Sequence, residues 1–249
     1  MAVRQLKATF VERIWGATDL APLFDNPEGK RIGEVWLTAD PPLPLLFKFI
    51  FTSEKLSVQV HPSGGTGTGK TEMWHILTTQ PGATVAAGFT REVSPEEARK
   101  AALDGSIEEL LQSIPVQPGD TVFIPAGTVH AIGAPLILFE VQQNSDITYR
   151  LYDYGRPREL HLDQGLAISH LFPHPGVNQP QGELLAACEY FEVERISVQE
   201  PRRIRDAVVT AIQGEGTIDA HVLRPGMSYQ IEGEAILEGC LEAIVARVP

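Results

Sequence analysis

Four side chains with metal-ligand chemistry lie on short segments in which apolar and polar residues alternate. Gln59 and His61 close the apolar run 56–60, Glu72 opens the next apolar segment, and His130 follows a later strand-like phrase. Successive side chains of a strand point to opposite faces, so Gln59 and His61 share one face. One Gln, two His and one Glu supply neutral and anionic N and O donors suited to a divalent metal. We therefore predict a metal site for zinc, with manganese, iron or cobalt as alternatives.

The alternative for either histidine alone is a hydrogen-bonded residue at a strand end. The full set of four favours a metal, because isolated ionisable groups are costly to bury without partners. His75 is one residue out of phase with Glu72, so we predict a structural or pocket-lining role for it. The remaining histidines have no metal-ligand spacing and are predicted to be structural or on the surface: His161, His170, His174 and His221.

Residues 64–71 match the phosphate-loop pattern G-x4-GK[ST] literally. A phosphate loop must open a helix whose N-terminal amides hold the phosphate. The residues that follow, EMWHILTT, have strand character and reach Pro81-Gly82 within about ten residues. We predict a flexible Gly/Thr loop beside a pocket and no nucleotide site.

The elements that must position these residues are mainly strands. The chain has 22 glycines and 19 prolines, which separate many short apolar runs in a β-rich pattern. The clearest helix signal has Ser94 as N-cap, Pro95 at the first position and Gly105 after its end, and a second short helix is predicted over residues 107–113. We expect antiparallel sheets, closed or sandwiched to hide their edges, with the helices as an insert.

A loop-like stretch rich in proline, residues 172–183, separates two lobes of the chain. We place the boundary so that residues 1–175 form the lobe with the predicted metal site and residues 176–249 form a second, smaller β lobe. A chain of 249 residues is long enough for one large domain or two small ones.

Charge and cysteine content narrow the function classes. The net charge is −12 and the isoelectric point about 5.0, which argues against a nucleic-acid-binding protein. Two cysteines, Cys188 and Cys240, are too few for a disulfide framework and favour a reducing compartment. The N-terminus lacks the apolar run of a signal peptide, and Lys48 interrupts the longest apolar stretch, 43–51. We expect a cytoplasmic protein that neither spans a membrane nor binds nucleic acid.

The spacing Gly119-x5-Pro125-x-Gly127-x2-His130 resembles the second signature of the cupin superfamily. The pair His61 and Glu72 resembles a loosened first signature. This resemblance implies an all-β fold: a cupin or jelly-roll barrel with a small helical insert, followed by a smaller cupin-like lobe. The second lobe has no His ligand pair, so we expect it to be metal-free.

Longer phrases resemble the type I phosphomannose isomerases, in their short bacterial form. They are LSVQVHP at 56–62, GKTEMW at 69–74, PAGTVHA at 125–131 and QQNSDITYRLYDY at 142–154. The resemblance spans nearly the whole chain. It implies interconversion of mannose 6-phosphate and fructose 6-phosphate through a cis-enediolate, with zinc bound by the equivalents of Gln59, His61, Glu72 and His130.

The resemblance also implies a catalytic arginine, here Arg150, and an active-site lysine, here Lys70. Isomerisation needs an electrophile and an acid/base pair, and Lys70 or Glu140 can move protons if burial shifts its pKa. The sequence does not choose between them. The alternative for Glu140 is a strand carboxylate paired with a neighbouring cation.

A sugar phosphate bound by an acidic protein needs cations or hydroxyls nearby. Lys48 and Lys55 flank the motifs, and Ser57 shares the Gln59 face. We take these three as candidate substrate-binding residues, each lysine having a solvated surface charge as its alternative. Arg156 and Arg158 also flank the motifs.

Two departures from the family pattern concern the pocket: the loop between His61 and Lys70 is short, and His75 stands where tyrosine is common.

A rival hypothesis is a cupin that binds a sugar phosphate without turnover. A third hypothesis, a cupin dioxygenase, would require iron and oxygen consumption. Either a monomer or a homodimer is compatible with the sequence.

Overall fold

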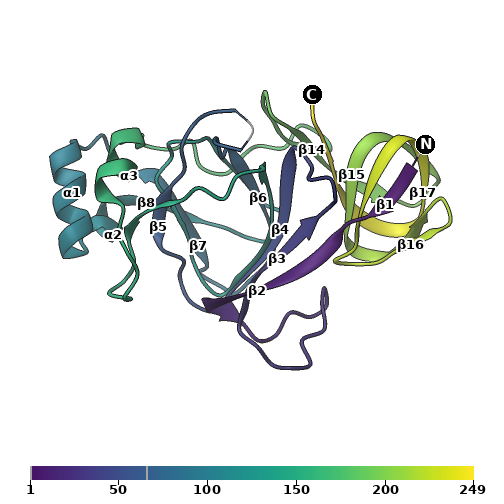
Figure 1. Ribbon diagram of the computed structural model, residues 1–249, viewed down its shortest axis with the longest axis horizontal. Helices are drawn as coiled ribbons and strands as arrows, with labels where there is room; N and C mark the ends of the chain where they lie inside the picture. The colour runs from purple at the N-terminus through teal and green to yellow at the C-terminus, as the bar shows by residue number, and fades with distance from the viewer. Residues whose placement is uncertain (1, 66) are drawn as a thin grey trace. The chain divides into compact units, whose positions relative to one another are not determined.

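A computed structural model describes residues 2–65 and 67–249, and the chain divides into two compact units. The central unit is Phe51–Asn178, and the terminal unit combines Met1–Ile50 with Gln179–Pro249. The mainly β class with a small helical insert is confirmed (Figure 1). The predicted division near residue 175 stays a prediction, although the contacts group the first fifty residues with the C-terminal part.

The described residues of the central unit form three helices and the strands of two antiparallel arrays. The first sheet has the order β12-β5-β10-β7-β8, and β11, β6 and β9 lie side by side in the second. The strands are β5 (Val58–Val60), β6 (Glu72–Thr79), β7 (Thr84–Phe89), β8 (Leu111–Pro115), β9 (Thr121–Ile124), β10 (His130–Ile132), β11 (Leu136–Gln143) and β12 (Tyr149–Tyr152). The helices are α1 (Pro95–Asp104), α2 (Ile107–Leu110) and α3 (Leu162–Ile168).

The helices cover one face of the five-stranded sheet, as Figure 1 shows beside β5, β7 and β8. Val58 and Val60 on β5 pack in one buried cluster with alanines of α1 and with Leu166 of α3. Alternation along β5 therefore turns Gln59 to the opposite face, away from the helices. This packing therefore determines that polar side chains such as Gln59 lie on the face of the sheet opposite the helices.

The first predicted helix is confirmed as α1. The Ser94 hydroxyl accepts a hydrogen bond from the Glu97 amide at 3.1 Å, and Gly105 ends the helix with φ 87°. Glycine reaches this left-handed conformation without a Cβ clash. The second predicted helix, 107–113, is wrong in its second half. It stops at Leu110, and Leu111–Pro115 pairs with β7 because Leu111 and Ile114 are buried in the sheet.

The terminal unit contains the remaining strands. They are β1 (Ala2–Gln5), β2 (Lys7–Ala17), β3 (Ile32–Thr38), β4 (Leu45–Thr52, which runs past the division), β13 (Leu184–Ala187), β14 (Glu192–Val198), β15 (Arg202–Ile218), β16 (His221–Leu223) and β17 (Ser228–Arg247). Strands β2, β3 and β4 follow one another in a sheet.

Two long strands, β15 and β17, organise the C-terminal sheet of the terminal unit. Val208 of β15 pairs with both Gln230 and Ala246, so the middle of β15 lies between two halves of β17. Strand β1 also pairs with β17, with Ala2 opposite Glu232. This arrangement covers strand edges that would otherwise be exposed.

Two features bear on membranes and redox state. No helix among the described residues is long and apolar enough to cross a membrane. Cys188 and Cys240 are both free thiols.

Candidate metal centre

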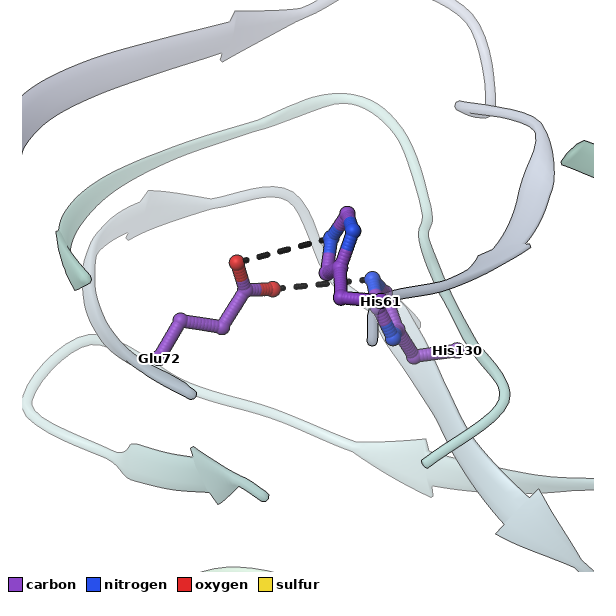
Figure 2. Close-up of side chains that lie close together, drawn as sticks. All are labelled: His61, Glu72 and His130. Atoms are coloured by element: carbon purple, nitrogen blue, oxygen red, sulfur yellow. Dashed lines mark ion pairs between the residues drawn. The ribbon is translucent and has the colours of Figure 1, made fainter. Parts of the chain in front are cut away.

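Three of the four predicted ligands meet in the interior of the central unit. His61 follows β5 and His130 opens β10 in one sheet, whereas Glu72 opens β6 in the other. Figure 2 shows the Glu72 carboxylate facing both imidazoles: Oε2 lies 3.6 Å from Nε2 of His61 and Oε1 lies 3.5 Å from Nε2 of His130. Each of the three side chains is about 1% exposed. In the described residues, this is the one group of His, Cys, Asp or Glu side chains close enough to share a metal ion.

The backbone orients both imidazoles. Nδ1 of His61 lies 2.8 Å from the carbonyl oxygen of Ile147, and Nδ1 of His130 lies 2.9 Å from that of Thr128. A carbonyl oxygen only accepts, so each Nδ1 carries the proton and donates it, which leaves a lone pair on each Nε2. Ligating histidines are typically oriented by such partners.

Burial keeps His130 neutral. Desolvation lowers the pKa of this imidazole from 6.5 to about 4, although the bond to the Thr128 carbonyl opposes the shift. A neutral imidazole is the form that binds a metal. Around neutral pH, His130 therefore needs no deprotonation before metal binding.

Gln59 completes the predicted set of donors. Its amide Nε2 lies 3.3 Å from Nε2 of His130, and its Oε1 accepts a hydrogen bond from the Ser57 hydroxyl at 3.3 Å. The two ends of a glutamine amide are assigned from hydrogen bonding, and rotation by half a turn would direct Oε1 to the histidine. With that rotation, the site would offer two imidazole nitrogens, a carboxylate and an amide oxygen.

The donor set fits a divalent metal ion. Ligand atoms at bond lengths of about 2.1 Å in a tetrahedral site stand about 3.4 Å apart, close to the 3.5 and 3.6 Å between Glu72 and the two imidazoles. Neutral N and O donors with one carboxylate suit zinc and several other divalent metals.

A buried lysine and a second buried carboxylate adjoin this cluster. Nζ of Lys70 lies 2.7 Å from Oε2 of Glu72, 2.9 Å from Nε2 of His61 and 4.0 Å from Oε1 of Glu140. The Trp74 indole donates to Oε2 of Glu140 at 3.1 Å. Charges are buried at acceptable cost only when paired in this way. The segment just before β6 and strand β11 therefore place an ammonium group and a carboxylate beside the predicted ligands.

Strand register explains how Arg150 reaches the same face. Gln59 pairs with His130 of β10 on one side and with Arg150 of β12 on the other. Directly opposed residues of antiparallel strands present side chains on the same face. Arg150, Gln59 and His130 thus form a row across three strands. The pKa of the Arg150 guanidinium is lowered, first by burial and then by the nearby Arg158.

The three predicted substrate-binding residues have different surroundings. Ser57 is buried and bonded to Gln59. Lys55 is largely exposed and pairs with Glu108 of α2 at 2.7 Å. Lys48 belongs to the terminal unit, where its Nζ is buried and lies 5.0 Å from the centroid of the Trp36 ring.

Sequence reasoning missed the groups that support the ligands. The carbonyls of Ile147 and Thr128 carry no sequence signal, because every residue has a carbonyl group. Trp74 did have a sequence signal. It is two residues after Glu72 on β6, so both side chains lie on the same face of the strand. The Trp74 ring packs edge-on against His130 at 5.4 Å between centroids.

Two other sequence predictions can be checked at this site. His75 is buried and pairs with the Thr121 hydroxyl at 2.9 Å, which fits the predicted structural role. The segment that matches the phosphate-loop pattern is followed by strand β6 and not by a helix, as predicted. Thr66 of that segment lies outside the described residues.

The chain is similar over nearly its full length to mannose-6-phosphate isomerase ManA of Bacillus subtilis (strain 168), with 30% identity covering 97% of this chain and 98% of the relative. Mannose-6-phosphate isomerase of Streptococcus mutans is 39% identical over 137 residues, 50% of this chain and 43% of the relative. No family model matches the chain.

Solved structures agree on the fold. The mannose 6-phosphate isomerase from Bacillus subtilis superimposes with a TM-score of 0.85 at 25% identity, covering 99% of this chain and all of that one. A zinc-bound mannose 6-phosphate isomerase gives a TM-score of 0.79 at 16% identity over 99% of each chain, which supports the fold alone.

Proposed function

The chain belongs to the mannose-6-phosphate isomerase family, and we propose that it interconverts mannose 6-phosphate and fructose 6-phosphate with a bound divalent metal ion, zinc first. The observation that carries the proposal is the buried group of His61, Glu72 and His130, whose Nε2 and carboxylate atoms face one another. These nitrogen and carboxylate donors suit a divalent metal ion, and the ammonium group of Lys70 supplies positive charge beside them.

Gln59, His61, Glu72 and His130 would hold the metal, which when bound supplies a Lewis acid for oxygens that gain negative charge. The reaction moves a proton from C2 of the open-chain aldose to C1 and passes through a cis-enediolate. Arg150, always charged, would stabilise the oxyanion or orient the sugar. Its place in the row with Gln59 and His130 supports this role.

We propose Lys70 and Glu140 as the groups that transfer protons. The two are buried with 4.0 Å between Nζ and Oε1, so a proton taken by one is close to the other. The Trp74 hydrogen bond to Oε2 of Glu140 restrains that carboxylate. General acid–base catalysis by positioned side chains contributes about 10²- to 10⁴-fold. In this proposal, Glu140→Gln lowers kcat within that range and leaves the metal content unchanged.

We propose that Ser57 and Lys55 of the central unit contact the phosphate, whereas Lys48 lies in the terminal unit and stays a prediction from the sequence. Ser57 has the stronger support, since its hydroxyl adjoins Gln59. Lys55 has the weaker, since its ammonium already pairs with Glu108. We also infer a cytoplasmic location from the two free cysteines. A monomer or a homodimer is compatible with this function.

A coupled assay of mannose 6-phosphate conversion tests the proposal directly. Purified protein should turn over substrate, lose activity on chelation and regain it when zinc is added. Metal-loaded protein that binds mannose 6-phosphate without any turnover would instead establish a binding protein. Activity that persists after complete metal removal would exclude the metal-dependent reaction.

A further inference from the structure

We propose that His161 is a positioning residue that fixes the orientation of Arg150, an inference that rests on the isomerase function proposed above. The segment Glu159–His161 forms hydrogen bonds with both the backbone and the guanidinium group of Arg150. The sequence offered no reason to link the two residues, since His161 lacks metal-ligand spacing.

Arg150 lies on an edge strand. Strand β12 is the last strand of its sheet, and its partner β5 occupies one side only. On the other side the His161 amide donates to the Arg150 carbonyl at 2.7 Å, and the Arg150 amide donates to Nδ1 of His161 at 3.2 Å. The imidazole nitrogen thus accepts the hydrogen bond that the carbonyl of a further strand would accept if the sheet continued. Both backbone polar groups of Arg150 are satisfied by the same residue.

The same segment holds one end of the guanidinium group. Nη1 of Arg150 donates to the Glu159 carbonyl at 2.9 Å, whereas Nε is buried and has no hydrogen-bond partner among the described residues. A buried donor without a partner costs free energy. An arginine can present its remaining N–H groups as a fork to an anionic oxygen. The contact with Glu159 therefore fixes the Nη1 end of the guanidinium group.

An ion pair with a buried carboxylate closes the turn that brings His161 back to Arg150. The Asp153 carboxylate accepts two hydrogen bonds from Arg158, both at 2.6 Å, and Asp153 is about 2% exposed. Tyr154 and Gly155 form the bend with positive φ values of 55° and 78°. The Tyr149 ring also lies 6.2 Å from the His161 ring. His161 is thereby held from the strand and from the turn.

The chemistry of the acceptor makes this role specific. Asn places its Oδ1 close to where His has Nδ1, so His161→Asn keeps an acceptor for the Arg150 amide. Gln extends its amide by one further carbon, and Ala has no acceptor. Loss of the acceptor leaves an edge amide unpaired and frees Arg150 to move. Misplacement by about 1 Å can cost on the order of 100-fold in rate.

The test compares His161→Ala, His161→Gln and His161→Asn in the isomerase assay, each with and without Arg150→Ala. We expect His161→Ala and His161→Gln to lower kcat on the order of 10- to 100-fold, and His161→Asn to restore most of it. In the Arg150→Ala background, where no guanidinium remains to be oriented, replacing His161 should change kcat less than about twofold. The exposed His221 provides the control, since His221→Ala should match the parent protein.

Equal kcat losses with and without Arg150 would overturn the proposal, as would equal kcat values for the Asn and Gln variants. Thermal unfolding of each variant checks the fold. If the Ala variant unfolds, the difference in kcat between the Asn and Gln variants tests the proposal. Failure of all three variants to fold would show a purely structural role for His161 and overturn the proposal. Absence of isomerase activity in the parent protein would instead refute the proposed function.

Discussion

The two units bury different chemistry within mainly β structure. The interior of the central unit holds the charged or ionisable side chains of Lys70, Glu72, His130 and Glu140, each nearly inaccessible to solvent. The core of the C-terminal sheet consists of apolar side chains and Tyr229, and a neutral hydrogen bond of 2.7 Å between Thr210 and Ser228 is buried in the same sheet. Buried charges cost stability, and proteins accept that cost at functional sites.

We infer that the central unit provides activity and that the terminal unit provides stability. In the central unit, the register between β5 and β10 sets Gln59 opposite His130, and Glu72 at the start of β6 faces the imidazoles of His61 and His130. In the terminal unit, the two halves of β17 enclose β15 around an apolar core. We expect substitutions in the first region to change activity and those in the second to change stability.

The largest expected effect is on activity in the central unit. His130→Ala removes one proposed metal ligand, and losing the metal would forfeit several kcal/mol of transition-state stabilisation, so kcat/KM should fall about 1,000-fold or more. Isomerase assays and metal analysis measure the effect, and circular dichroism should show an unchanged fold. A fully active variant would contradict the metal-centre assignment.

The opposite effect is expected in the terminal unit. Leu237→Ala truncates a side chain with no exposed surface in the apolar core. The free energy of unfolding should fall by about 2–5 kcal/mol, from lost burial and the cavity left behind. Urea denaturation measures this, while kcat per folded molecule should match the parent. A large loss of kcat in a fully folded variant would contradict the inference that the terminal unit affects stability and not activity.

Acid should destabilise the metal-free protein through His130. Burial holds the pKa of this imidazole at about 4 in the folded protein, below its ordinary 6.5. The unfolded state therefore binds more protons between these values, and the free energy of unfolding should fall as the pH drops from 6.5 to 4, by up to about 3 kcal/mol.

Denaturation of the chelated protein at several pH values measures the slope. His130→Gln should show a shallower pH dependence over this range, whereas Leu237→Ala should keep the parent slope at lower overall stability. Parallel curves for the parent and His130→Gln would show that His130 does not carry the effect.

The smallest effect is expected at Trp74. Trp74→Phe keeps an aromatic ring against His130 but removes the indole donor to Glu140. An unsatisfied buried acceptor costs about 1–3 kcal/mol, so both stability and kcat should decrease moderately. Chemical denaturation and steady-state kinetics measure the two changes. An unaltered kcat would argue against a catalytic Glu140 restrained by Trp74.

Local sequence signals predicted several elements correctly. The cap at Ser94 and the glycine at Gly105 bound α1 as expected. The apolar runs at 45–51 and 136–143 lie on strands, as do residues 192–198 of the run at 191–198. The second helix failed in its second half because residues 111–115 pair with β7, and tertiary pairing overrides a weak helical preference.

By itself, the sequence determined which residue types could bind a metal, the shared face of Gln59 and His61, and the strand that replaces a phosphate-loop helix after Lys70. These depend on side-chain chemistry and on the alternation of one strand. Only the tertiary structure decided that Gln59 pairs with His130 and Arg150, that carbonyls of Ile147 and Thr128 orient the imidazoles, and that His161 returns to Arg150. Alternation fixes which face a side chain takes, but register between distant strands depends on the packing of the whole unit.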